Sequence, residues 1–161
     1  MTDSQKIKEF LSETASISIG YNELNFFSPT DLEDEQIGYS VDDKGNSLIK
    51  GQIGDWENSW VVIGYDSLGD PIIVDCSDPI LPVLTSQHGQ GEWELILIAN
   101  NLENFKQIIQ DLSALSIGRQ SPDEMESNPV SKIDVENFTK NIKNNNSSVD
   151  VGYWESILQD E

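Results

Sequence analysis

The side chains best suited to chemistry in this chain are acids that gather around one apolar segment. Asp66, Asp70 and Asp75 interrupt or follow two runs of β-branched residues between positions 59 and 75. Carboxylates there can form a negative patch that meets basic residues of a partner. Aspartate in a tight turn also accepts hydrogen bonds from the turn backbone, so both interpretations stay open. We expect these acids to point outward from the turn.

Two tryptophans precede this segment. Trp56 and Trp60 lie four residues apart, and Asp55 and Glu57 flank the first of them. Tryptophan is enriched in the energetic hot spots of protein interfaces. We expect Trp60 to be buried because it begins a strand, and Trp56 to be partly exposed, as an interface anchor or as a cover for the sheet edge. The full set of candidate partner-binding residues is Asp55, Trp56, Glu57, Asp66, Asp70, Asp75 and His88.

Metal binding has little support in the sequence. His88 is the only histidine, so a zinc site would have to recruit carboxylates or the single cysteine, Cys76. The alternating acids, glycine and distant glutamate of a calcium-binding EF-hand loop are absent. We therefore expect no metal and no cofactor, with His88 as a partly exposed loop residue and Cys76 as a small buried hydrophobic residue.

Catalytic motifs are also missing. The chain has neither the Gly-x-Ser-x-Gly turn of a serine hydrolase nor a glycine-rich phosphate loop that ends in lysine. Asp75 and Asp78 could act as an acid and base pair, as two carboxyls do in glycosidases. In a chain with 29 acidic residues, however, such pairs arise by chance. The sequence therefore favours a protein that is not an enzyme.

Charge narrows the class of partner. The 161 residues carry 29 acids and 9 bases, a formal net charge of −20. Such a surface attracts cationic proteins. Direct binding of nucleic acid is disfavoured because phosphate contacts need clustered Lys and Arg, and Arg119 is the only arginine. A basic protein is the partner that the composition predicts.

The N-terminal residues lack the basic and apolar regions of a secretory signal, and no apolar run approaches the roughly 20 residues that span a bilayer. A single cysteine also forms no internal disulfide. We therefore expect a cytoplasmic protein that does not associate with membranes.

Hydrophobic patterns predict mixed helix and strand. Ser4 can cap a first helix, and Asn100 or Asn101 begins the clearest helix, whose apolar residues recur every three or four positions up to Leu115. Pro82 limits the apolar run at 80–84 to an edge strand. Strands are expected at 17–19, 24–27, 61–63, 72–74 and 92–99, with 61–63 and 72–74 forming a hairpin.

The C-terminal part reads as an extension. Residues 119–130 contain Ser-Pro and Asn-Pro steps and resemble a surface linker, and two short helices follow Ser131 and Asp150. We expect Trp154 to dock the last helix on the sheet or on a second subunit, which leaves a homodimer possible. The prediction is one α+β domain over 1–161, with a core at about 24–117 and a helical extension at about 122–161. Its largely antiparallel sheet has helices packed on one side.

One set of residues forms a pattern across the hairpin and its neighbours. It comprises Trp60-x-x-Ile63-Gly64-x-Asp66-x-x-Gly69-Asp70-x-Ile72-x-x-Asp75, then Pro82-Val83, His88 and Ile98-Ala99-x-x-Leu102-x-x-Phe105, and upstream Phe27-Ser28-Pro29-x-x-Leu32. With these residues the chain resembles the SUKH superfamily from about residue 55 to 115. The N-terminal Leu-Pro and Asn-Gly signature of that family is missing, and the extension from Pro122 lies outside the resemblance.

The SUKH superfamily includes fungal regulators of cell-wall synthesis and bacterial immunity proteins that neutralise toxins. The resemblance implies a non-enzymatic protein-binding module, most plainly an immunity protein that holds a toxin domain inactive. Two alternatives remain. One is a small-molecule or peptide-binding protein with a pocket between the sheet and the helix of Phe105, and the other is a regulatory scaffold subunit that dimerises.

Overall fold

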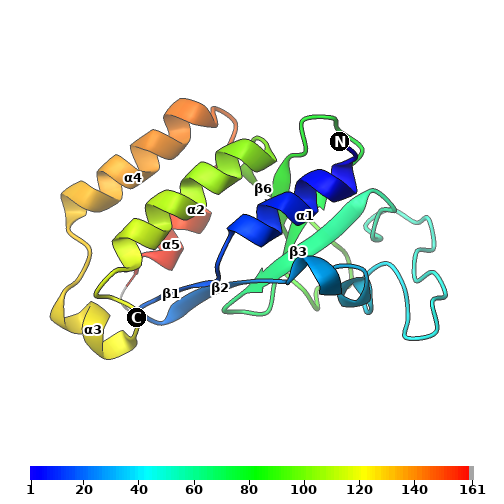
Figure 1. Ribbon diagram of the computed structural model, residues 1–161, viewed down its shortest axis with the longest axis horizontal. Coiled ribbons are helices and arrows are strands. Elements are labelled where there is room, and N and C mark those ends of the chain that lie inside the picture. The colour runs from blue at the N-terminus through cyan, green and yellow to red at the C-terminus, as the bar shows by residue number, and fades with distance from the viewer. Residues whose placement is uncertain (160–161) are drawn as a thin grey trace.

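One antiparallel sheet organises the chain in the computed structural model, which describes residues 1–159 (Figure 1). The spatial order of the strands follows the sequence, so every connection joins neighbours. The predicted α+β class is confirmed. The six strands are β1 (Ile17–Ile19), β2 (Asn22–Phe26), β3 (Trp60–Asp66), β4 (Pro71–Asp75), β5 (Val83–Thr85) and β6 (Ile96–Ala99).

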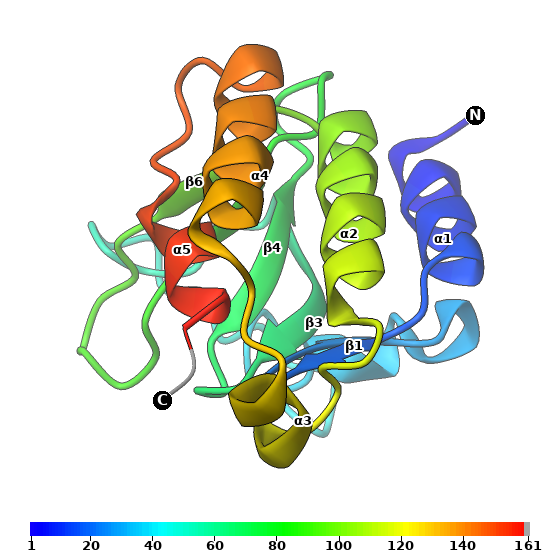
Figure 2. The same ribbon diagram turned by 90° about the vertical axis from the view of Figure 1, so that its left-hand side faces the viewer.

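The helices pack on one side of this sheet, as predicted. Figure 2 shows α1, α2 and α4 in a row in front of the strands, with α5 tucked beside β6. Two short 3₁₀ turns, η1 (Pro29–Asp31) and η2 (Asp34–Gln36), follow β2. The helices are α1 (Asp3–Glu13), α2 (Leu102–Ser116), α3 (Pro122–Ser127), α4 (Lys132–Asn145) and α5 (Gly152–Ile157).

Capping side chains explain where helices α1 and α2 begin. Thr2 and Gln5 form a reciprocal capping box on α1, so the cap lies two residues before the predicted Ser4. The side chain of Asn101 accepts a hydrogen bond from the backbone N–H of Asn104 and starts α2, one of the two predicted positions. The apolar stripe of α2 is buried as its spacing predicts.

Residues 119–130 are not a surface linker, and that prediction is wrong. Ser121 accepts a hydrogen bond from the backbone N–H of Glu124, and Pro122 occupies the first turn, where its missing N–H costs nothing. The resulting helix α3 buries Met125 completely. The carbonyl of Arg119 also accepts a hydrogen bond from Gly20 N at 2.7 Å, which ties the extension to the β1–β2 turn.

The extension also closes the other edge of the sheet. The indole N–H of Trp154 donates to the carbonyl of Ile98 at 2.9 Å, and the side chain of Asn146 accepts from Asn100 N at 2.8 Å. Trp154 is fully buried against Phe105 and Phe138. Trp154 therefore docks the last helix on its own sheet, and the extension shares one hydrophobic core with the strands.

Two strand predictions need correction. Strand β5 lies between β4 and β6, so it is not an edge strand. Pro82 is tolerated because it precedes the first paired residue, and its carbonyl still accepts a hydrogen bond from Asp75 N. The strand expected at 92–99 begins only at Ile96, because Trp93 N instead donates to the carbonyl of Gly54 at 2.8 Å.

Replacing Trp154 should test how strongly the extension stabilises the fold. We expect Trp154→Phe to lower the free energy of unfolding by about 2–4 kcal/mol, because the buried carbonyl of Ile98 loses its donor and the smaller ring leaves a cavity. Urea unfolding followed by far-UV circular dichroism measures this loss. The exposed Ile133 provides the control, since Ile133→Ala should change stability by less than about 0.5 kcal/mol. Equal effects of the two substitutions would contradict the docking role.

Candidate partner-binding site

Asp66 holds the turn between β3 and β4. Its Oδ1 accepts hydrogen bonds from Leu68 N and Asp70 N, both at 3.0 Å, and Gly69 adopts a φ of +80° that favours glycine. Asp66 is only 8% exposed. The expectation that acids point outward here is wrong, because the backbone of the turn takes up the carboxylate.

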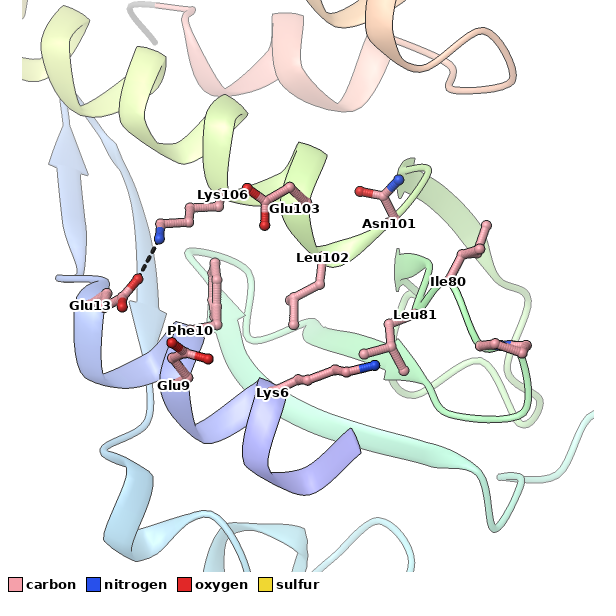
Figure 3. Close-up of a pocket in the computed structure, with 11 residues that line it drawn as sticks. Lys6, Glu9, Phe10, Glu13, Ile80, Leu81, Asn101, Leu102, Glu103 and Lys106 are labelled. Atoms are coloured by element: carbon pink, nitrogen blue, oxygen red, sulfur yellow. Dashed lines mark hydrogen bonds and ion pairs between the residues drawn. The ribbon is translucent and has the colours of Figure 1, made fainter. Parts of the chain in front are cut away.

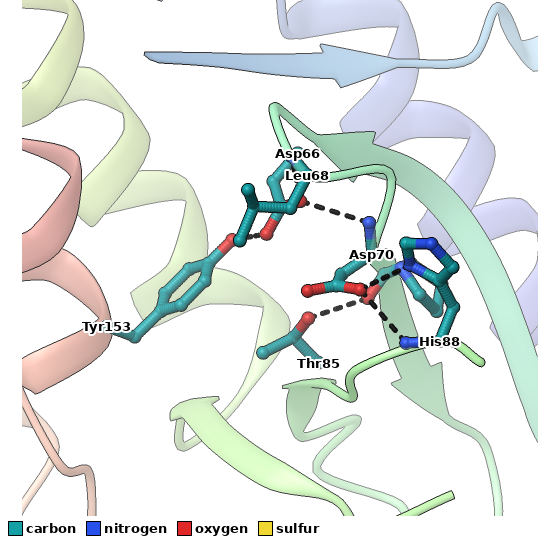
Figure 4. A network of polar contacts seen from close by, with 7 residues as sticks. Asp66, Leu68, Asp70, Thr85, His88 and Tyr153 are labelled. Atoms are coloured by element: carbon teal, nitrogen blue, oxygen red, sulfur yellow. Dashed lines mark hydrogen bonds and ion pairs between the residues drawn. The ribbon is translucent and has the colours of Figure 1, made fainter. Parts of the chain in front are cut away.

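Asp70 connects this turn to the loop after β5. Its Oδ1 accepts a hydrogen bond from His88 N at 3.0 Å and lies 2.6 Å from Nδ1 of the same residue (Figure 4). The Asp70 side chain is 10% exposed and that of His88 is 56% exposed. His88 is therefore a partly exposed loop residue, as predicted, and its ring covers one side of a buried carboxylate.

Tyr153 brings helix α5 to the same network. Its hydroxyl donates to Oδ2 of Asp66 at 3.1 Å. Burial raises the pKa of Asp66, although its hydrogen bonds oppose that rise. Burial also raises the pKa of Tyr153, and the neighbouring carboxylates of Asp66 and Asp70 raise it further. No local pattern in the sequence reveals this contact of Tyr153 with a turn 87 residues away.

Asp75 lies at the opposite end of the hairpin. It pairs with Trp60, the first residue of β3, whereas Asp66 is the last. A strand of that length spans roughly 20 Å. The Oδ1 of Asp75 accepts hydrogen bonds from Ser59 Oγ and Ser77 N, both at 2.9 Å. The three candidate aspartates therefore do not form one patch, and each of them caps local structure.

An aromatic cluster of Tyr39, Trp56, Trp60 and Trp93 covers the face of the sheet away from the helices. Trp56 packs edge to face on both Trp60 and Trp93, with ring centroids 5.2 Å apart in each pair. Trp56 is 3% exposed, so the expectation of partial exposure is wrong, while Trp60 is buried as predicted. The segment that follows η2 folds back over the strands and buries Trp56.

Exposed acids surround this cluster. Asp55 is half-buried and its Oδ2 accepts a hydrogen bond from Gln52 N, whereas Glu57 is exposed. The backbone hydrogen bond between Trp93 and Gly54 brings Glu92 and Glu94 next to them. Burial raises the pKa of Tyr39, and so do the charges of Asp70 and Glu35. We call the exposed and half-exposed acids around the aromatic cluster the acidic face: Glu35, Asp55, Glu57, Glu92 and Glu94.

A separate cleft of about 440 Å³ opens between α1, the start of α2 and the β4–β5 connection (Figure 3). Charged residues of both signs line it, and Lys106 of α2 forms an ion pair with Glu13 of α1. The space between the sheet and α2 at Phe105 is filled by side chains, so the cleft at the start of α2 lies beside that position. Phe105 is fully buried there and fills that space against Phe10 and Trp154.

Residues that could support metal or thiol chemistry are not assembled. Within residues 1–159, no three His, Cys, Asp or Glu side chains are grouped closely enough to hold a metal ion. Burial raises the pKa of Cys76 to about 11, and the nearby carboxylates of Asp3 and Asp75 add to the rise. The Cys76 thiol is therefore protonated at neutral pH and is a poor nucleophile. None of the helices described for residues 1–159 has the length and apolar character that crossing a membrane requires.

Comparisons of this chain with protein-family models, with curated proteins and with solved structures gave no match. The likeness to the SUKH superfamily therefore stays a prediction from the sequence.

The carboxyl of Asp66 should leave a signature in the pH dependence of stability. Its pKa in the folded state lies above the ordinary value of 3.8, so its contribution to stability is complete below that value and is lost as pH rises through the folded pKa. Asp66→Asn keeps an acceptor for the turn backbone and cannot ionise. We expect the stability of the native protein, relative to this variant, to fall as pH rises above 3.8 in urea unfolding.

The control for that experiment is Asp43→Asn, which removes the same charge from an exposed loop. Its stability should follow that of the native protein across the pH range apart from a small constant offset. Parallel curves for the native protein and the Asp66 variant would contradict the assignment.

Proposed function

We propose that this protein is a non-enzymatic binding module of the immunity type, which holds a basic toxin domain inactive by contact with the acidic face. The observation that carries the proposal is the uneven distribution of charge. Residues 31–57 contain eight acids and two lysines, whereas residues 102–159 contain nine acids and five bases over twice the length. Negative charge is therefore densest where the irregular segment covers the aromatic cluster.

The aromatic cluster supports this role because it gives the acidic face a rigid base. Acids on a mobile loop lose entropy when a partner orders them, whereas acids on a packed scaffold do not. The buried side chain of Trp56 anchors the backbone that carries Asp55 and Glu57 on the sheet. Complementary charge presented in this way speeds association and disfavours partners of the wrong sign.

The residues behind the SUKH resemblance support the same hairpin in physical terms. A Cβ on Gly64 would lie 2.1 Å from the carbonyl oxygen of Asn25, so only glycine allows β2 to pair with β3 there. Asp66 and Asp70 cap the turn and the following loop. Through these hydrogen bonds the motif residues maintain the scaffold that carries the acidic face.

The carboxyls considered for catalysis have structural partners, which favours a non-enzymatic role. Asp75 accepts hydrogen bonds from Ser59 and Ser77, and Asp78 accepts one from Ile80 N at 3.1 Å. Both side chains therefore stabilise the β4–β5 connection. An acid and base pair would instead need one carboxyl free to exchange a proton with substrate.

A second candidate function, binding of a small molecule or peptide, has one observation in its favour. The cleft beside α1 has a volume of about 440 Å³, within the range of roughly 300–1,000 Å³ of small-molecule sites. Its charged lining differs from the largely apolar walls of such sites. A thermal-shift screen with a metabolite library tests it, and stabilisation lost in Lys6→Ala, a change at an exposed residue of the cleft wall, would favour this function. For a scaffold that dimerises, the described C-terminal helices offer no apolar patch, since their exposed Ile133 stands alone.

Charge reversal on the acidic face should abolish partner binding. We expect the native protein, immobilised at low salt, to retain a basic protein from host extract and to release it as salt screens the contact. Mass spectrometry identifies that protein, and purified material then gives the affinity. Because like charges across an interface cost several kcal/mol, a Glu57→Lys, Glu94→Lys double variant should bind at least about tenfold more weakly.

The matched control reverses two exposed acids of α4, with Asp134→Lys and Glu136→Lys. This double variant makes the same change in net charge at residues far from the acidic face in the sequence. It should therefore bind the partner as tightly as the native protein does at equal salt. Equal weakening in both double variants would mean that net charge, and not the acidic face, governs binding. Retention that neither salt nor either variant affects would reject the electrostatic model.

A further inference from the structure

A small cavity of about 190 Å³ opens beside the network of Asp66, Asp70 and Tyr153. It lies between the β3–β4 turn, the end of β5 and helix α5. Its walls include the polar residues Asp66, Asp70, Ser86 and Tyr153 and the apolar residues Leu68 and Ile157. No lysine or arginine lines it. The cavity is thus rich in acceptors and lacks a cation of its own.

One oxygen of Asp70 is left for a ligand. Oδ1 is occupied by His88, but residues 1–159 donate no hydrogen bond to Oδ2. Figure 4 shows this second oxygen pointing away from His88, toward the side where Thr85 and Tyr153 lie. The side chain is 10% exposed. A carboxylate buried to this extent normally has its acceptors satisfied, because an unpaired charge in a protein interior is costly.

A second polar group at the cavity has no partner. Ser86 is 1% exposed, and its hydroxyl makes no hydrogen bond with the described residues. Ser86 lines the same cavity as Asp70. Buried polar groups without partners are rare in native structures, so the Ser86 hydroxyl, together with the unoccupied oxygen of Asp70, suits a ligand that brings several N–H donors. The two carboxylates also make the site electrically negative, which favours a cationic ligand.

We propose that this cavity binds a guanidinium group, and that an arginine side chain of the basic partner supplies it. The proposal deepens the proposed function and rests on it for the source of the arginine. A guanidinium carries five N–H donors in a plane and is more weakly hydrated than an ammonium, so it tolerates burial better. Its flat faces match the apolar walls of Leu68 and Ile157. The volume lies below that of sites for drug-sized ligands, which fits a single side chain.

The probe for this site is methylguanidinium chloride, titrated into the full chain labelled with ¹⁵N. We expect saturable shifts of the backbone amide signals of Leu68, Asp70, Ser86 and His88, with a dissociation constant in the millimolar range for so small a ligand. Tetramethylammonium chloride carries the same charge without N–H donors and should give no saturable shift. Equal responses to both salts, or no saturation with either, would overturn the proposal.

Asp70→Asn separates recognition from folding. The amide oxygen can still accept the hydrogen bond of His88 N, while the amide NH₂ group replaces the free acceptor with a donor. We expect methylguanidinium to bind at least about tenfold more weakly, since hydrogen bonds to charged groups contribute about 1.5–3 kcal/mol. If that variant does not fold, the Leu68→Arg variant provides the test of binding in the cavity. Residue 68 is exposed, so an arginine there can enter the cavity and block the probe, whereas Ile133→Arg, at an exposed residue outside the cavity, should leave binding intact.

The outcomes for the cavity and for the partner are distinguishable. If methylguanidinium binds in a manner that depends on Asp70 but no basic protein is retained, the guanidinium site is supported and the proposed partner is rejected. If a basic protein binds the acidic face yet Asp70→Asn and Leu68→Arg bind it as tightly as the native protein, the arginine pocket is overturned and the proposed function stands.

Discussion

The Asp66 carboxyl joins parts of the chain that lie 87 residues apart. One oxygen accepts hydrogen bonds from the turn between β3 and β4, and the other accepts the hydroxyl of Tyr153 from α5. Because α5 also places Trp154 against β6, this contact and the hydrogen bond from Trp154 to Ile98 together fix the position of the last helix on the sheet. The same turn orients Asp70, whose carboxylate accepts a hydrogen bond from the loop that contains His88. The hairpin, the C-terminal extension and the cavity beside Asp70 all depend on this buried acid.

The two faces of the sheet are covered in different ways. Helices cover one face through regular apolar stripes, whereas the other is covered by aromatic side chains from irregular segments. Irregular backbone carries fewer internal hydrogen bonds, so large rings such as Trp56 and Trp93 must supply much of its stability through burial. That arrangement frees the intervening positions for exposed charge. The dense negative charge of residues 31–57 is compatible with folding because it lies on this outer layer.

Apolar patterns in the local sequence predicted the fold. The site was harder to predict because it depends on single contacts between residues that are far apart in the sequence. The spacing of apolar residues in α2 gives one buried face, and the β-branched runs of β3 and β4, which are buried on both faces, flank a turn, so class and hairpin followed from local sequence. Helix α3 was missed because its Ser-Pro start resembles a turn, and the burial of Met125 in a distant core, which stabilises the helix, leaves no local signal. Trp56 was misplaced and Tyr153 overlooked for the same reason, since partners far away in sequence determine whether a side chain is buried.

Charge repulsion links the stability of this chain to the partner that we propose. A net charge of −20 opposes compaction, and repulsion is greatest where acids crowd the irregular layer. Few positive charges offset this repulsion, since among residues 31–57 only Lys44 and Lys50 are basic. A basic domain seated on the acidic face would neutralise that charge and would bind only the folded state, where the aromatic cluster holds the acids together. Folding and binding would then reinforce each other by mass action. A chain of this composition gains most stability from a cationic partner, and an arginine that enters the cavity beside Asp70 would bring positive charge closest to the carboxylates on which the fold depends.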